Sequence, residues 1–403
     1  MTDTALSIVI PYKQRLDNIR AVFTSLTEQT LPADRFEVVV GAMEYDPAYT
    51  ALCAEFTGRL RIVSVHTAED WNTSRARNLA IGQASGTVVV VLDADVALAP
   101  DALRNLWERH YQHGQNVCVQ GEVFGYDAVI DDDVDSVETQ PYEVFRAAFG
   151  RLDESGAGRD PRWTAAYASA FARFPWAFVR TGLMALPAAT IRRHGLLLDE
   201  GFLGWGAEDQ EWGLRIARTG TPIVLGQGVR GIHLPHRRDF AAQDRSATLT
   251  NRYYLAKWPR LDLELALAFG GWLEADRHYP EARRELAAAA PGQRLGVVVG
   301  AVDGTRLLLA GVLLSPDGQT GPDGRPLVVD PEAEALFGPG GQSAYEHVLP
   351  LAGFALPFED GSVDAYCLLP RVDRLTAPYR DAVRREAGRV ALRALPAQAA
   401  AAA

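Results

Sequence analysis

Two aspartates that flank an alanine are the residues of this chain best suited to chemistry, Asp93-Ala94-Asp95. They follow Thr87–Leu92, an apolar and largely β-branched run that is typical of a strand buried on both faces. A buried carboxylate is costly unless it is paired or bound to a metal. Side chains at i and i+2 of an extended chain point the same way, so both aspartates could serve one cation. The triplet alone leaves a solvated turn as an equal alternative.

A second polar segment closes the first apolar strand, Pro11-Tyr12-Lys13-Gln14-Arg15. The proline ends the strand, the aromatic ring can cover a base, and two cations can meet phosphate. Taken by itself, the segment also fits a solvated basic turn.

Arg77 and Asn78 lie on the helix expected just before the Thr87–Leu92 strand. Because they are neighbours, they leave the helix on different sides. We therefore expect one of them to lie at the surface and the other to brace the aspartate triplet or a ligand.

A third polar segment combines glycines, an aromatic residue and acids: Gly204, Trp205, Gly206, Glu208 and Asp209. Glycines around a tryptophan make a flexible platform on which a sugar ring can stack. The two acids begin a helix, where the helix dipole favours an ionised carboxylate, and such a group can accept a proton from a hydroxyl. Helix capping is the alternative reading of the acids, but capping alone does not require the preceding Gly-Trp-Gly.

His233 and His236 form the last candidate group, three residues apart after a strand-like stretch. A lone histidine is usually structural, whereas two at this spacing could donate a nitrogen to the cation of the aspartate pair. Neutral imidazole suits manganese better than calcium.

Strands and helices alternate in the first third of the chain, which predicts an α/β fold with a mostly parallel sheet flanked by helices. Ligands of such sheets bind beyond the carboxyl ends of the strands, where the first two segments lie. The expected strands are 6–10, 36–40, 61–65, 87–92 and 182–186. One expected helix begins near Asp17, which we expect to cap it, and another begins near Pro100. Further expected helices cover about 73–83, 187–195 and 209–219.

In this order the segments resemble family 2 nucleotide-sugar glycosyltransferases of GT-A fold, whose sheet is Rossmann-like, with a C-terminal half like that of the β-1,4-galactosyltransferases. The resemblance covers roughly residues 6 to 240. It implies an inverting transfer from a nucleotide-sugar, a UDP-sugar by expectation, to a hydroxyl of a sugar, small molecule or peptide. Catalysis would fall to Asp209 as base and Glu208. A metal, Mn2+ or Mg2+, would bind Asp95, Asp93, His233 and His236. The implied nucleotide-sugar contacts are Pro11, Tyr12, Lys13, Arg15, Arg77, Asn78, Asp93, Ala94, Trp205 and Gly206.

The chain departs from the family at the end of the second strand. Many members have an aspartate pair there that reaches the uracil, and this chain has Gly41-Ala42 instead, so Glu44 or Asp46 is expected to substitute. A related Trp-Gly-Gly-Glu-Asn segment occurs in retaining N-acetylgalactosaminyltransferases, but Asp209 in place of that asparagine favours a base and inversion. A retaining N-acetylhexosaminyl-type transferase and a non-catalytic sugar- or nucleotide-binding protein are the alternatives.

The changing character of the sequence predicts several parts: a glycosyltransferase domain over 1–260, a helical linker over 261–290, a small α/β module over 291–395 and a disordered tail over 396–403. The module resembles the later part of a class I methyltransferase, but Gly300–Gly304 is a poor stand-in for a cofactor loop, so a degenerate module is expected. We also expect a long mobile loop over 151–175 and a solvated acidic loop at 131–135.

Composition restricts the partners and the compartment. The chain has 403 residues, 48% of them hydrophobic, and its net charge of −11 argues against nucleic acid as a partner. Three scattered cysteines are expected to be reduced thiols. Without an apparent signal sequence or transmembrane segment, a cytoplasmic protein is expected, and a homodimer is left open.

Overall fold

The computed structural model divides the chain into two compact units, 1–250 and 251–403. It describes residues 4–125, 139–155, 158–236, 239–316, 319–321, 324–337 and 345–396. The expected acidic loop at 131–135 lies outside these residues, and so does the expected tail at 396–403 apart from residue 396. The division falls ten residues before the expected end of the first domain, and the expected linker forms the helices α10 (Leu261–Phe269) and α11 (Trp272–Ala289) of the second unit.

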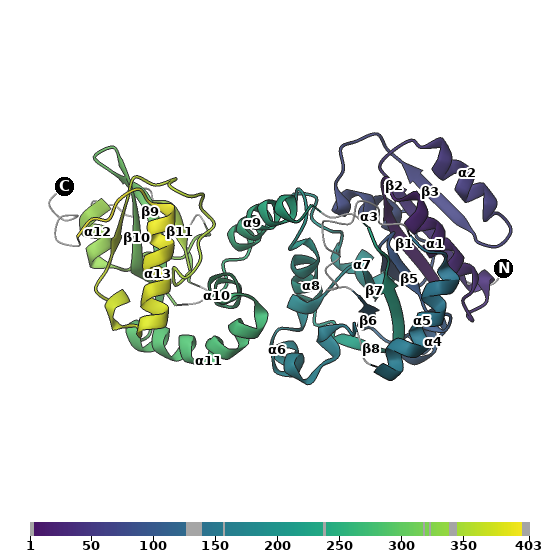
Figure 1. Cartoon of the computed structure of the whole chain (residues 1–403). Helices are drawn as coiled ribbons and strands as arrows, with labels where there is room; N and C mark the ends of the chain where they lie inside the picture. Colours follow the sequence, from purple (N-terminus) through teal and green to yellow (C-terminus); the bar gives the residue numbers. More distant parts are fainter. Residues whose placement is uncertain are drawn as a thin grey trace. The chain divides into compact units, whose positions relative to one another are not determined.

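The first unit is built on an eight-stranded sheet with the order β3-β2-β1-β4-β7-β6-β8-β5. Figure 1 draws this unit in purple to teal, with helices around the strands of the sheet. Neighbours from β3 to β4 run parallel, β7 is antiparallel to both β4 and β6, and β5 is antiparallel to β8. The sheet confirms the expected mixed and mostly parallel α/β fold. Its strands are β1 (Leu6–Tyr12), β2 (Phe36–Ala42), β3 (Ile62–His66), β4 (Val88–Leu92), β5 (Val96–Leu98), β6 (Cys118–Phe124), β7 (Leu183–Pro187) and β8 (Ile223–His233).

Apolar side chains cover both faces of this sheet. Successive side chains along each central strand point in turn to one layer of helices and then to the other. Ile8 and Ile10 of β1 face a cluster that includes α1, α2, α4 and α5, while Val9 between them faces α3, α7 and α8. Parallel strands covered on both sides read as continuous apolar runs, which explains the valine-rich β4. These helices are α1 (Leu16–Thr27), α2 (Pro47–Glu55), α3 (Thr73–Ile81), α4 (Ala102–His110), α5 (Tyr142–Ser155), α7 (Ala188–His194) and α8 (Glu208–Arg218).

Two expectations about local structure are wrong. The helix α1 has Arg15 at its N-cap, and Asp17 lies in its first turn without capping it. The segment expected as a long mobile loop over 151–175 contains the end of α5 and a series of short helices, among them α6 (Ala168–Arg173). Within this segment the Phe174 side chain is buried, which ties its end to the core.

The second unit contains a four-stranded sheet with the order β11-β9-β10-β12. A hairpin joins the antiparallel strands β9 and β10 through Asp303 and Gly304, both with positive φ, as tight two-residue hairpin turns require. Gly300–Gly304 is therefore the end of a strand and its turn, not a loop that leads into a helix. The elements of this unit include β9 (Arg294–Val302), β10 (Thr305–Leu314), α12 (Pro331–Phe337), β11 (Tyr345–Leu349), β12 (Ala365–Leu368) and α13 (Ala377–Val390).

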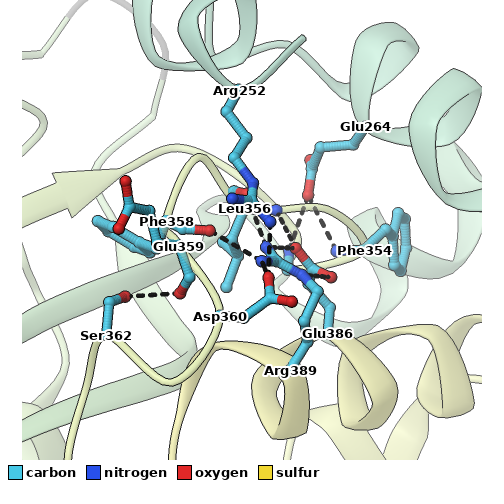
Figure 2. A network of polar contacts seen from close by, with 11 residues as sticks. Arg252, Glu264, Phe354, Leu356, Phe358, Glu359, Asp360, Ser362, Glu386 and Arg389 are labelled. Atoms are coloured by element: carbon cyan, nitrogen blue, oxygen red, sulfur yellow. Dashed lines mark hydrogen bonds and ion pairs between the residues drawn. The ribbon is translucent and has the colours of Figure 1, made fainter. Parts of the chain in front are cut away.

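Buried carboxylates hold the chain segment before β12 in place (Figure 2). Glu264 of α10 accepts hydrogen bonds from the backbone N–H groups of Ala352, Gly353 and Phe354 at 2.8–3.0 Å. Glu386 of α13 accepts from the N–H of Leu356 at 2.6 Å. Backbone donors that would otherwise be buried without partners are thus satisfied by side chains.

Two further observations concern the expected compartment, and a third concerns the division of the chain. Cys53, Cys118 and Cys367 are all free thiols. Among the residues that the structure describes, no helix has the length and apolar character needed to cross a membrane. The helix α9 (Phe240–Lys257) runs across the division between the two units.

Candidate active site

The chain turns between Asp93 and Asp95, so the two side chains diverge. The N–H of Val96 donates to the carbonyl of Asp93 at 3.1 Å, which closes the turn around Ala94. The expectation that both aspartates point the same way is therefore wrong, because it assumed an extended chain through the triplet. Asp93 pairs with Arg77 at 2.8 Å, whereas Asp95 faces two histidines.

Asp95, His233 and His236 form a cluster whose ligand atoms all lie within 4.8 Å of one another. Antiparallel pairing of β5 with β8 builds it, since Val96 lies opposite His233. The Nε2 atom of His236 is 3.2 Å from the Asp95 carboxylate, and that of His233 is 3.9 Å away. One carboxylate and two imidazoles are a donor set suited to manganese or another transition metal, so these residues fit the expected ion.

Arg15 contacts the same Asp95 carboxylate from the end of β1. Its guanidinium is about a third exposed, so a cation from this segment lies at the mouth of the cluster. Gln14, before it, has a φ of +55°, and its N–H donates to the Glu44 carboxylate at 2.7 Å. The exits of β1 and β2 are thereby tied together, which places Lys13 and Arg15 at the carboxyl edge of the sheet.

Two expected nucleotide contacts lie inside the core. Pro11 and Tyr12 belong to β1, and the Tyr12 side chain is 0% exposed with its ring stacked on Tyr49 at 4.4 Å. The Tyr12 ring cannot cover a base from this position, because strand β1 continues two residues further than the sequence predicted. Of the two acids expected to substitute at the base, Asp46 caps α2 through the N–H of Ala48 at 2.8 Å.

Arg77 connects the aspartate triplet to the acids at the start of α8. Its guanidinium is buried, pairs with Asp93 at 2.8 Å and reaches Glu208 at 3.2 Å. The sequence predicted that either Arg77 or Asn78 braces the triplet, and the structure assigns this contact to Arg77. The expectation that the other residue lies at the surface is wrong, because Asn78 is buried. Its amide exchanges hydrogen bonds with the main chain of Leu198 and donates to Glu200.

Asp209 is a half-buried acid in the first turn of α8, and its pKa is strongly raised. Burial raises its pKa to about 7, and the negative charge of Glu208 adds to the rise. The positive charges of Arg180 and Arg77 and the N–H of Gln210 act in the opposite direction. A carboxyl group whose pKa lies near neutrality is matched to taking a proton from a hydroxyl group.

The Gly204-Trp205-Gly206 segment presents an exposed aromatic ring beside this acid pair. The Trp205 side chain is 57% exposed. Gly204 and Gly206 have φ angles of +98° and +108°, and Ala207 at the N-cap of α8 has a φ of +64°. Such backbone angles favour glycine, which explains the residues on either side of the tryptophan.

Sequence reasoning missed two features of the site. Arg180, which lowers the pKa of Asp209, precedes β7 and could have been noticed as a cation in an apolar segment. The hydroxyl group of Ser246 contacts the main chain of Trp205, 41 residues earlier, and no local pattern signals this contact.

The strand ends of this mixed sheet thus carry a carboxylate–histidine cluster and a neighbouring acid–tryptophan segment. The family model "Glycosyl transferase family 2" matches residues 7–155. Two proteins named validoxylamine A glucosyltransferase, from Streptomyces hygroscopicus subsp. jinggangensis (strain 5008) and subsp. limoneus, are 30% identical to this chain over 299 residues. The alignment covers 72% of this chain and 70% and 65% of those proteins.

Two solved structures align with this chain at TM-scores below 0.5. The mannosyltransferase PcManGT from Pyrobaculum calidifontis, in complex with GDP-Man and Mn2+, aligns with a TM-score of 0.45 and 20% identity over 71% of this chain and 75% of its own. S. aureus TarS 1–349 in complex with UDP-GlcNAc aligns with a TM-score of 0.43 and 15% identity over 63% and 66%. On the sequence relationship, this chain belongs to glycosyltransferase family 2 and is a glycosyltransferase.

Proposed function

We propose that the enzyme transfers a sugar from a UDP-sugar, with UDP-glucose as the first donor to test, to a hydroxyl group of a polyhydroxylated small molecule with inversion at the anomeric carbon. The observation that carries the proposal is Asp209, a half-buried acid whose pKa is raised to about 7 and whose neighbour Glu208 is linked through Arg77 to Asp93. A base beside a diphosphate site is what direct displacement requires.

In this mechanism Asp209 accepts the proton of the acceptor hydroxyl as its oxygen attacks the anomeric carbon. The bond from that carbon to the diphosphate breaks on the opposite face, and UDP leaves with the electron pair. Lys13 and Arg15 place positive charge beside the leaving group. Asp95, His233 and His236 would hold a divalent metal, Mn2+ or Mg2+, which when bound neutralises the diphosphate.

The remaining family positions have roles that suit their locations. Trp205 offers its exposed ring to a sugar, and Gly206 lets the chain approach closely. Ala94, 6% exposed in the turn of the triplet, presents its backbone to the donor. The names of the Streptomyces relatives suggest validoxylamine A as the first acceptor to try and glucose as the first sugar.

The test is nucleotide release followed by product analysis. The protein is incubated with UDP-glucose, UDP-GlcNAc or GDP-mannose, with Mn2+ or Mg2+ or with a chelator, and with validoxylamine A or simple glycosides as acceptors. Metal-dependent release of UDP and a β-linked product by NMR would support the proposal, since UDP-glucose carries an α-linked sugar. An α-linked product would overturn inversion, and no nucleotide release with any pair would overturn transferase activity with these donors.

A further inference from the structure

The main chain of Trp205 is held by a helix that lies far along the sequence. The N–H of Trp205 donates to Oγ of Ser246 at 2.6 Å, and the Ser246 hydroxyl is 3.1 Å from the carbonyl oxygen of Trp205. The Thr250 hydroxyl lies 3.3 Å from the same carbonyl oxygen. Ser246 and Thr250 are one turn apart on α9, so one face of this helix contacts both the N–H and the carbonyl oxygen of Trp205.

The glycines beside Trp205 show how closely α9 approaches the segment. A Cβ atom added to Gly204 would lie 2.1 Å from Oγ of Ser246, and one added to Gly206 would lie 3.3 Å from Oγ1 of Thr250. Because these glycines and Ala207 all have positive φ, the segment needs outside contacts to hold one conformation. The contacts from α9 supply them.

We propose that Ser246 is a positioning residue that fixes the indole of Trp205 at the acceptor side of the site. The role rests on the proposed transfer to a hydroxyl acceptor. Trp205 has an exposed ring but a fixed backbone, which allows an aromatic platform to bind a sugar ring without ordering the segment at each encounter. Ser246 lies outside the acid and metal clusters, so it acts through Trp205 and not on the reacting atoms.

The first test is Ser246→Ala with Thr248→Ala as a matched control. Thr248 is on the same helix, is exposed, and its hydroxyl donates to the carbonyl of Asp244 within the helix. With UDP-glucose and validoxylamine A, we expect S246A to raise the KM for the acceptor by about fivefold to tenfold, the usual effect of losing one or two neutral hydrogen bonds. The KM for the donor should stay unchanged, and T248A should leave both constants unchanged.

A double-mutant cycle separates positioning from general stability. If Ser246 acts through the indole, S246A should cause no further rise in acceptor KM when Trp205 is already replaced by Ala. A full additional rise in the S246A/W205A protein would overturn the proposal. Thr250→Val, which removes the more distant hydroxyl and keeps the shape of the side chain, should have a smaller effect than S246A.

Amide hydrogen exchange gives a readout that needs no acceptor. In S246A we expect faster exchange in a peptide spanning 203–207, because the Trp205 N–H loses its acceptor, with no change in T248A. Unchanged exchange, or an unchanged acceptor KM in an active enzyme, would overturn the positioning role. If the wild-type enzyme releases no nucleotide with any donor and acceptor of the panel, the proposed function fails separately.

Discussion

Asp209 in the first unit and Glu264 in the second are both acids whose pKa is raised by loss of solvent, to about 7 and about 8, although Asp209 is only half-buried and Glu264 is fully buried. They differ in their hydrogen bonds. Glu264 accepts three backbone N–H groups through its two oxygens, whereas the hydrogen bond recorded for the Asp209 carboxylate comes from the N–H of Gln210. The same elevated pKa therefore has two different consequences.

Saturated hydrogen bonding makes Glu264 a structural group. Its carboxylate fixes the segment around Gly353 to α10, and exchanging any of these bonds for a substrate contact would leave buried N–H groups without partners. Asp209 retains acceptor capacity and lies beside the exposed Trp205 segment and the Arg77-linked acids. A raised pKa indicates chemistry only where the acid still has room for a reacting partner.

The largest expected effect comes from removing the base. Asp209→Asn should lower kcat for sugar transfer by roughly 10²–10⁴-fold, the usual contribution of a general base, because the amide cannot accept the hydroxyl proton. Nucleotide binding, followed by thermal shift with UDP and Mn2+, should remain largely intact. Asp244→Asn on α9 serves as the matched control. Full activity of D209N would contradict the assignment of the base.

The second effect concerns the cluster of Asp95, His233 and His236, the proposed metal site. Asp95→Ala removes the carboxylate that faces His233 and His236, and we expect metal-dependent UDP binding to weaken by about 3 kcal/mol, roughly a hundredfold. Calorimetric titration of UDP with and without Mn2+ measures this difference. The exposed Asp34→Ala is the control. An equal response to Mn2+ in D95A and the wild type would remove Asp95 from the site.

Parts of this comparison were predictable from the sequence because they depend on local patterns. The apolar run before the triplet predicted β4, and the acids after Gly206 predicted the start of α8 to within one residue. The three-residue strand β5 was missed because it is too short to show a periodicity. Yet β5 brings Asp95 beside His233, so the cluster depends on a strand pairing more than a hundred residues apart in sequence.

Other errors came from assuming that local geometry continues through a functional segment. The triplet was treated as extended, and the turn at Ala94 instead sends Asp93 to Arg77. Tyr12 was placed after the strand, although it is its last residue and packs on Tyr49. Both errors concern strand ends, where main-chain hydrogen bonds and not side-chain periodicity decide which way a residue points.

The third expected effect is a loss of stability when Glu264 is replaced. Glu264→Gln keeps one oxygen for Gly353 and Phe354 but turns an amide donor toward the N–H of Ala352, so one buried donor loses its acceptor. We expect the free energy of unfolding of the second unit to fall by about 1–3 kcal/mol. Urea denaturation followed by circular dichroism measures this loss, with the exposed Glu334→Gln as the control. Unchanged stability of E264Q would contradict the structural role.

The pH dependence of activity and that of stability separate the two acids, because they have opposite signs. These are the smallest of the expected effects. Asp209 must be ionised to act as a base, so kcat/KM should rise with pH and level off near 7, with about a tenfold loss for each unit below that value. Glu264 holds a proton in the folded protein that the unfolded chain loses above about pH 4.5, because its folded pKa is about 8. The free energy of unfolding should therefore fall as the pH rises between these values.

Measuring both quantities on the same protein tests the assignment. Initial rates of UDP release should increase over a range of about pH 5.5 to 8.5, which includes both raised pKa values, while the denaturation midpoint decreases. In E264Q the free energy of unfolding should depend less on pH, and the rising part of the pH–activity profile should stay at the same pH. In Glu208→Gln the activity limb should move to lower pH, because the neighbouring charge that raises the pKa of Asp209 is gone. An activity limb near the ordinary aspartate pKa in the wild type would show that Asp209 is not the group that sets the rate.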